Sequence, residues 1–346
     1  MSATAAVPAA PFGRALLRRA GPVNLRLLLL LAGLVVVFAT LLGDRLFTAA
    51  SLRSMAFQLP ELAILSLAMM IPLISGGLDL SIISTANLVA LFIAFLFHAL
   101  LPGLSGVVWI GAFVLCLLLG FALAAVVGLV NGLIVSRLDV SPILTTLGSM
   151  TLIKGISIGF THGNVLSGFP TPIVFIGNGS VLGIPAVVLI LVATAILMAV
   201  VVNRSPFGHV LTMLGSNAEA TRYSGIDTAR ALLGVYVTSA LLAALAGLVM
   251  MSRFNSANAA YGESYLLVTI LAAVLGGISP SGGFGKVAGL VIALVILQLI
   301  STAFNLLNFS QFLTLAIWGA ILLAVAGLSR LREQLRPLLA RRRPPA

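Results

Sequence analysis

The chain carries very little charge for its length. Asp, Glu, Lys and Arg together make up only 8% of its 346 residues, against roughly 25% in soluble globular domains. Hydrophobic residues make up 60%, and the mean hydropathy is +1.21. This composition excludes a soluble enzyme or binding module and predicts a protein that crosses a membrane many times.

Residues that carry chemistry are also scarce. Cys116 is the single cysteine, and His98, His162 and His209 lie far apart in the sequence, so we expect no disulfide within the chain, no metal site and no histidine-based catalytic group. No nucleotide-binding loop of the form GxxxxGK(S/T) occurs in the sequence. The nearest resemblance, Gly-Phe-Gly-Lys at 283–286, has the wrong spacing of glycines. The chain is therefore expected not to be an enzyme and to bind no cofactor of its own.

The net charge of +11 has a pattern that points to membrane orientation. Basic residues gather at the ends of apolar segments and are not interleaved with aromatic residues, which argues against nucleic-acid binding. With ten spans and a cytoplasmic N-terminus, fifteen Lys and Arg residues fall on the cytoplasmic side and three on the outer side. This asymmetry follows the positive-inside rule and predicts that both termini are cytoplasmic.

Long apolar segments dominate what is present, and each has about the 20 residues that a spanning helix needs. They are 25–43, 55–74, 82–101, 107–135, 142–160, 184–203, 231–252, 265–278, 287–306 and 311–328. The prediction is an all-α membrane helix bundle of about ten transmembrane helices. It forms one domain at 25–328, between a basic cytoplasmic segment at 1–24 and a basic cytoplasmic tail at 329–346.

Two connections between these segments have recognisable structure signals. The longest cytoplasmic connection, 204–230, contains Asn217, which can cap a helix over 218–223, and Gly225, which can end it. Such a helix either docks a partner or is a solvated connector. On the outer side, the Gly- and Pro-rich connection 161–183 is expected to carry a short surface helix.

A polar break at 76–81, Gly-Gly-Leu-Asp-Leu-Ser, separates two of the apolar segments. A carboxylate at the membrane costs several kcal/mol, so Asp79 needs a stabilising role. It can belong to a transport route, or it can cap the helix that begins near Ser81 and shape the loop, and we favour the second interpretation. Gly76 and Gly77 allow the tight reversal of the chain.

Neutral polar side chains lie in or beside several spans, where lipid offers them no hydrogen bond. They are expected to face the bundle interior, either as interhelical hydrogen-bonding groups or as the lining of a route for an uncharged, hydroxylated solute. Glu61 and Lys154 are expected to extend toward the outer surface, and an ion pair between them is a second option. The candidate route residues are Asn87, Asn131, Thr145, Thr146, Ser149 and Thr269.

Five motifs, in order, resemble the permease subunit of bacterial ABC importers for ribose, xylose and related monosaccharides. The resemblance runs from about residue 50 to residue 328. The motifs are Gly-Gly-Leu-Asp-Leu-Ser at 76–81, Asn-Gly-Leu-Ile-Val-Ser-Arg-Leu at 131–138, Ser-Pro-Ile-Leu-Thr-Thr-Leu-Gly-Ser-Met-Thr at 141–151, Gly-Ser-Asn-Ala-Glu-Ala-Thr-Arg-Tyr-Ser-Gly-Ile at 215–226, and Leu-Gly-Gly-Ile-Ser-Pro-Ser-Gly-Gly-Phe-Gly at 275–285.

This resemblance implies a permease in the bacterial inner membrane that moves a monosaccharide or a similar small polyhydroxylated solute. It implies four kinds of partner: a cytoplasmic ABC ATPase that binds the ATP, a periplasmic solute-binding protein, a second permease copy or sister permease, and the solute itself. In that family the loop matched by 215–226 docks the ATPase. The coupling residues carried over in this way are Gly215, Asn217, Glu219, Arg222, Ser224 and Gly225.

The chain also departs from the ribose-type pattern. Ile82 and Ile83 follow Ser81 where Val and Gly are usual, and Leu266 and Val268 replace the usual acids, so the solute can be a pentose, a hexose, a polyol or a molecule such as autoinducer 2. An ion-coupled secondary transporter is the alternative function, because Gly-Gly breaks interrupt the helices of such proteins. The breaks in this chain do not have the register of an inverted repeat, however.

Overall fold

The computed structural model describes residues 22–340, and within them each predicted apolar segment corresponds to a helix. The predicted segment 1–24 lies almost entirely outside the described residues. The ten helices are α2 (Pro22–Leu42), α3 (Ala49–Ile74), α4 (Ile82–Leu100), α5 (Gly106–Arg137), α6 (Pro142–Thr161), α8 (Ala186–Arg204), α11 (Thr228–Phe254), α12 (Tyr265–Leu275), α13 (Val287–Leu306) and α14 (Gln311–Ala340).

Eight helices in the described part of the chain are long and apolar enough to cross a membrane. The other two of the ten are α12, which has 11 residues, and α14, whose apolar part, Gln311–Val325, is shorter than a full span. The prediction of an all-α membrane bundle is confirmed, with α12 as the short helix that 265–278 suggested. The end of α14 runs through the first part of the predicted tail.

Short elements fill the connections. The outer connection contains α7 (Thr171–Asn178), the surface helix expected there, and the cytoplasmic connection contains α9 (Pro206–Ser216) and α10 (Ala218–Tyr223). A single 3-10 turn, η1 (Gly43–Arg45), follows α2. The two small antiparallel sheets pair β1 (Leu166–Ser167) with β4 (Ser256–Ala257), and β2 (Ser180–Val181) with β3 (Ile184–Pro185).

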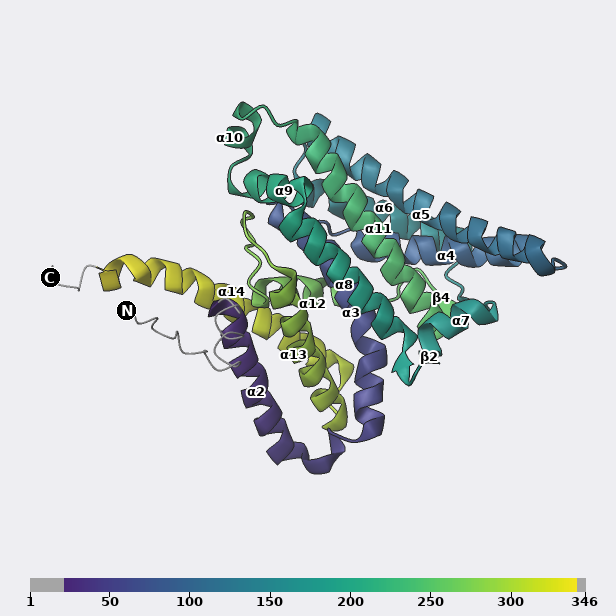
Figure 1. The fold of residues 1–346 in the computed structure, drawn as a ribbon, viewed down its shortest axis with the longest axis horizontal. Coiled ribbons are helices and arrows are strands. Elements are labelled where there is room, and N and C mark those ends of the chain that lie inside the picture. Colours follow the sequence, from purple (N-terminus) through teal and green to yellow (C-terminus); the bar gives the residue numbers. More distant parts are fainter. Residues whose placement is uncertain (1–21, 341–346) are drawn as a thin grey trace, which may run out of the picture.

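The core is built around α3 and α11. Every residue of α3 from Pro60 to Ile74 is buried, which is unusual for a single helix and means that protein surrounds it on all sides. Helix α11 packs against α3, α4 and α5, with α4 to α6 on one side of this pair and α2 and α12 to α14 on the other (Figure 1). Helices α2 and α5 expose long apolar side chains such as Val36, Val107 and Leu118, as expected where lipid covers them.

Close approach between helices depends on glycine. A Cβ added to Gly128 in α5 would lie 2.6 Å from the Tyr236 carbonyl oxygen and 2.7 Å from the Val237 Cα of α11. A side chain at this position would therefore force α5 away from α11. Small residues at helix contacts of this kind are typical of membrane bundles, because they let backbones come close enough for tight van der Waals packing.

A chain with ten spans places successive connections on alternating sides of the membrane, and connections assigned to the same side in this way do lie together. At one end, Gly283 of the connection after α12 donates its backbone N–H to the carbonyl of Ile74, at the end of α3 (2.9 Å). At the other end, β1 pairs with β4, and Asn258 donates to the carbonyl of Gly163 (3.4 Å). The connections therefore alternate between the two ends of the bundle, as the ten-span prediction requires. Which end faces the cytoplasm stays a prediction.

Candidate functional site

Asp79 is buried in the loop between α3 and α4 and holds that loop to α11. Its Oδ1 accepts hydrogen bonds from the backbone N–H (3.0 Å) and the hydroxyl (2.6 Å) of Ser81, and its Oδ2 accepts one from the Ser239 hydroxyl of α11 (2.8 Å). Burial raises the pKa of the Asp79 carboxyl, and the hydrogen bonds from Ser81 and Ser239 act in the opposite direction. The carboxylate therefore shapes the loop, as favoured, but its bonds go to the N-cap residue and not to the first turn of α4.

The hydrogen bonds of Asp79 continue into two more helices. Asn131 of α5 donates from Nδ2 to the Ser81 hydroxyl (3.0 Å), and Ser149 of α6 donates to Oδ1 of Asn131. One chain of side-chain hydrogen bonds thus connects α11, the 76–81 loop, α5 and α6. This network brings together two of the predicted route residues and gives both a structural partner.

The other predicted route residues fall into different environments. Thr146 and Thr269 donate to backbone carbonyls of Pro142 (2.8 Å) and Leu266 (2.7 Å) in their own helices. The Thr146 hydroxyl also lies 3.3 Å from the Leu78 carbonyl of the 76–81 loop. The buried Thr145 hydroxyl has no partner among the described residues. Asn87 of α4 donates to the carbonyls of Ala259 (3.0 Å) and Tyr261 (2.8 Å). Three of the six, Asn131, Thr146 and Ser149, thus bond to the 76–81 loop or to one another, while Asn87 bonds to the connection after α11.

Asn87 is the predicted route residue that borders a cavity toward the outer connections. The cavity has a volume of about 160 Å3 and is also lined by Ser84, Lys154 and Glu263. Lys154 Nζ lies 2.8 Å from Oε1 of Glu263, and both side chains are partly exposed. The optional Glu61–Lys154 pair is therefore wrong, because the basic partner of Glu61 lies elsewhere and Lys154 has an acid of its own.

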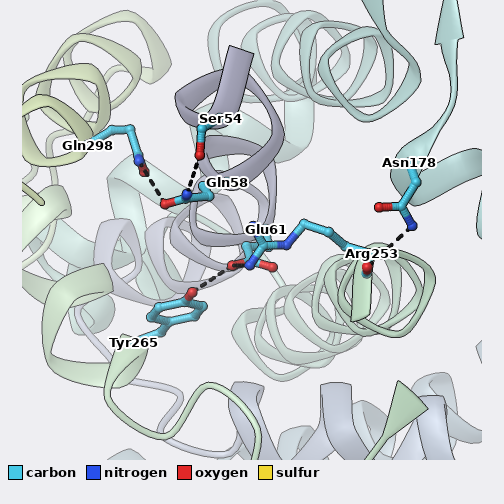
Figure 2. Close-up of polar contacts among 7 residues, drawn as sticks. All are labelled: Ser54, Gln58, Glu61, Asn178, Arg253, Tyr265 and Gln298. Atoms are coloured by element: carbon cyan, nitrogen blue, oxygen red, sulfur yellow. Dashed lines mark hydrogen bonds and ion pairs between the residues drawn. The ribbon is translucent and has the colours of Figure 1, made fainter. Parts of the chain in front are cut away.

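Glu61 does not extend to the outer surface as expected. It is 0% exposed, and its Oε1 accepts hydrogen bonds from Arg253 Nη2 of α11 (3.0 Å) and from the hydroxyl of Tyr265 at the start of α12 (2.6 Å). Figure 2 shows these side chains meeting from three helices, with Arg253 beside Asn178 of α7. The sequence carried a signal that was missed, since Arg253 is one of the three basic residues that the ten-span topology places on the outer side, where Glu61 was also expected.

The connection 204–230, which we call the coupling segment, has the local structure that the sequence predicted around Asn217 and Gly225. Oδ1 of Asn217 accepts a hydrogen bond from the backbone N–H of Ala220 (2.9 Å) and so caps α10, and Gly225 follows the helix with φ +81°. The side chains of Glu219 and Arg222 are exposed on α10, and Tyr223 beside them is 84% exposed. Helix α10 thus offers charged and aromatic groups to a partner at this end of the molecule.

Behind α10, three glycine-rich segments meet in what we call the glycine junction, formed by Gly76, Gly215, Gly282 and Gly283. A Cβ on Gly215 would lie 2.0 Å from the Ile74 carbonyl oxygen and 2.3 Å from the Gly283 backbone nitrogen, and one on Gly282 would lie 2.7 Å from the Gly215 Cα. The end of α9 therefore rests on the end of α3 and on the connection before α13 with no side chain between them. Motifs 76–81, 215–226 and 275–285 converge here.

No group of three His, Cys, Asp or Glu side chains that could hold a metal ion occurs among the described residues. The acids in the bundle instead have local partners: Asp79 has two serines, Glu61 has Arg253 and Tyr265, and Glu263 has Lys154. The arrangement therefore offers hydrogen bonds and ion pairs between helices, beside small cavities.

Comparison with known proteins agrees with this description. The model of a family described as "Branched-chain amino acid transport system / permease component" matches residues 51–326. The ribose import permease protein RbsC of Bacillus subtilis is 31% identical over 299 residues, which are 86% of this chain and 90% of that protein. No solved structure gives a significant match.

Two further relatives are similar over most of their length. The L-arabinose transport system permease protein AraH of Escherichia coli is 29% identical over 308 residues, 87% of this chain and 91% of that protein. The autoinducer 2 import system permease protein LsrD of Yersinia enterocolitica is 30% identical over 270 residues, 76% of this chain and 78% of that protein.

Proposed function

The chain belongs to the permease family that it matches over residues 51–326, and we propose that it imports a monosaccharide or a similar small polyhydroxylated solute as the membrane subunit of an ATP-driven ABC importer. It is a multi-pass protein of the inner membrane. Relatives named for ribose, L-arabinose and autoinducer 2 support this solute class. The observation that carries the proposal is the glycine junction, because it joins an exposed coupling segment to helices of the membrane core.

The sequence has no nucleotide-binding loop of its own, so the energy for import would come from a partner. A cytoplasmic ABC ATPase would bind and hydrolyse the ATP and would dock on α10 through Glu219 and Arg222. Movement of α9 and α10 would reach the end of α3 and the connection before α13 through backbone contacts at Gly215. Because no flexible side chain lies between these segments, little of the displacement would be lost in rotamer changes.

The remaining partners belong at the opposite end and beside the chain. A periplasmic solute-binding protein would deliver the solute to the outer connections around α7 and the loop that contains Glu263. A second copy of the chain or a sister permease would complete the passage. Both termini would lie in the cytoplasm, where the basic residues are concentrated.

Reconstitution into liposomes tests the proposal. With a partner ATPase and a solute-binding protein encoded beside it, the chain should accumulate labelled D-ribose or L-arabinose only when ATP is supplied. L-leucine is the comparison solute, because the family description names branched-chain amino acids. Uptake by the purified chain alone, driven by an ion gradient, would contradict the proposal and favour a secondary transporter.

The docking assignment has its own test. Glu219→Arg together with Arg222→Glu should reduce co-purification of the ATPase by at least about tenfold, because like charges placed opposite each other at a contact cost about 1.4 kcal/mol or more. Arg137→Gln, a charge change at the end of α5 and outside 204–230, is the matched control. Normal membrane insertion with unchanged ATPase binding would remove α10 from the docking surface.

A further inference from the structure

A second cavity lies between α3, α12, α13 and α14, on the other side of α3 from the Asp79 network. It has a volume of about 170 Å3, enough for several waters or one small solute. We call it the polar cavity. Among the residues that line it, six carry hydrogen-bonding groups that matter here: Gln58, Gln298, Ser301, Gln311, Thr314 and Trp318.

The lining of the polar cavity has no charge. Its walls combine amides, hydroxyls and the rings of Tyr265 and Trp318 with four aliphatic side chains, so that most of the lining surface is apolar, and no Asp, Glu, Lys or Arg is among them. The outer cavity beside Asn87, by contrast, includes Lys154 and Glu263. Amides and hydroxyls both donate and accept hydrogen bonds, which suits a neutral solute with many hydroxyl groups. A zwitterion would bring two charges into this cavity with no opposite charge to meet them.

Much of the hydrogen-bonding capacity in the polar cavity is unused. Within the described residues, no hydrogen bond is made by the side chains of the exposed Gln311, the half-buried Ser301 and Thr314, or Trp318. Gln298 makes only long bonds, 3.3 Å to Gln58 Oε1 and 3.4 Å to Thr302 Oγ1. Hydroxyls, amides and an indole N–H that face a cavity and have no partner in the chain can bond to water or to a ligand there. The cavity therefore offers unused donors and acceptors to a solute.

Two walls of the polar cavity are held in place from behind. Figure 2 shows Gln58 between Ser54 and Gln298, so that α3 and α13 are connected across the cavity edge. The Tyr265 ring is oriented by the bond from its hydroxyl to Glu61, which is itself paired with Arg253. A binding surface made of side chains whose orientation is already determined loses little entropy on binding.

We propose that the polar cavity is a weak binding site for the transported solute inside the permease, specific for neutral polyhydroxylated molecules. This inference rests on the proposed function and adds the position and the chemistry of the site. Hydroxyl groups of the solute would bond to Gln298, Ser301 and Thr314, while the face of its ring would lie against Trp318. Glu61 acts as a positioning residue through Tyr265 and does not touch the solute.

Tryptophan fluorescence provides a direct test, because the chain has only two tryptophans, Trp109 and Trp318. Trp109 lies in α5 and stacks on Phe113, so Trp109→Phe leaves Trp318 as the single reporter without touching the polar cavity. The purified full chain in lipid nanodiscs is titrated with D-ribose, L-arabinose and L-leucine. The sugar that the complete importer takes up should change the Trp318 emission saturably, and L-leucine should not.

Variants of the lining identify the site. In the Trp109→Phe chain, Gln298→Leu and Ser301→Ala should each raise the half-saturating sugar concentration about tenfold, the effect of losing one well-placed hydrogen bond. Thr40→Val in α2, whose hydroxyl bonds only to its own helix, is the control and should leave the titration unchanged. Trp318→Phe, which keeps Trp109, should lose the saturable signal.

Uptake by the complete importer separates the two proposals. If sugar uptake is ATP-dependent but the Trp318 emission does not respond, and Gln298→Leu and Ser301→Ala transport at the normal rate, the polar cavity is not a solute site and the proposed function stands. If no sugar is taken up by the complete importer, the proposed function fails, and the assignment of the cavity fails with it. Ser301→Ala removes one oxygen atom only, which guards against misfolding as the cause of a loss.

Discussion

Two carboxylates in the bundle are stabilised in different ways. Asp79 receives three hydrogen bonds from two serines and has no basic partner within the described residues. Glu61 is paired with Arg253 and receives the Tyr265 hydroxyl. The difference has consequences for mutation. Removal of the Glu61 charge leaves the Arg253 charge without compensation, whereas removal of the Asp79 charge leaves only neutral serine hydroxyls.

Glu61→Gln should destabilise the chain by up to about 3 kcal/mol, since it leaves the mostly buried Arg253 side chain, which is 18% exposed, without a counter-charge. Thermal unfolding in detergent, followed by size-exclusion chromatography, measures the loss. The matched control is Glu263→Gln, which breaks the partly exposed pair with Lys154 and should cost less than about 1 kcal/mol. Equal losses for the two variants would show that the Glu61 pair contributes nothing special to stability.

Among the structural elements, α9 and α10 stand out because they connect an exposed surface to the core. Capping by Asn217 and the left-handed Gly225 determine α10 locally, and both were evident in the sequence. The contact between α9 and α3 was not, because it depends on glycines from three distant motifs that meet only in the folded bundle. The capped helix α10 can therefore be predicted from neighbouring residues, whereas the contact of α9 with α3 can be known only from the tertiary structure.

Gly215→Ala should uncouple ATP hydrolysis from transport. Its Cβ would lie 2.0 Å from the Ile74 carbonyl oxygen, so α9 must move away from α3 while α10 keeps its docking surface. Sugar uptake should fall at least about tenfold, equivalent to about 1.4 kcal/mol in the barrier, with ATP hydrolysis by the assembled importer maintained.

The control for this variant is Gly33→Ala in α2, where an added Cβ meets no atom within 4 Å. It should transport at the normal rate. If uptake and hydrolysis both remain normal in Gly215→Ala, motion does not pass through the glycine junction.

For the molecule as a whole, orientation in the membrane is the property that most constrains function. The coupling segment and the glycine junction lie at one end, and the β1–β4 pairing lies at the other. The positive-inside rule assigns the first end to the cytoplasm. In the proposed importer, solute delivery and ATP hydrolysis would then be separated by the full thickness of the bundle.

Cysteine labelling in intact cells and inverted vesicles checks this orientation. In a Cys116→Ala background, Tyr223→Cys in α10 should react with a membrane-impermeant maleimide only in inverted vesicles, because Tyr223 is 84% exposed at the predicted cytoplasmic end. Leu182→Cys, at a position that is 99% exposed between β2 and β3, should react only in intact cells. The reverse pattern would overturn the orientation and, with it, the docking assignment.

Order and composition of the residues were enough to establish the membrane class, the ten helical segments, the short α12 and the capped α10, because hydropathy, length and capping act over neighbouring residues. Folding alone settled which groups meet. Glu61 pairs with Arg253, 192 residues away, four glycines form one junction, and neutral side chains from α3, α13 and α14 surround one cavity. These contacts depend on the rotation and distance of whole helices, and no local pattern in a single segment encodes those.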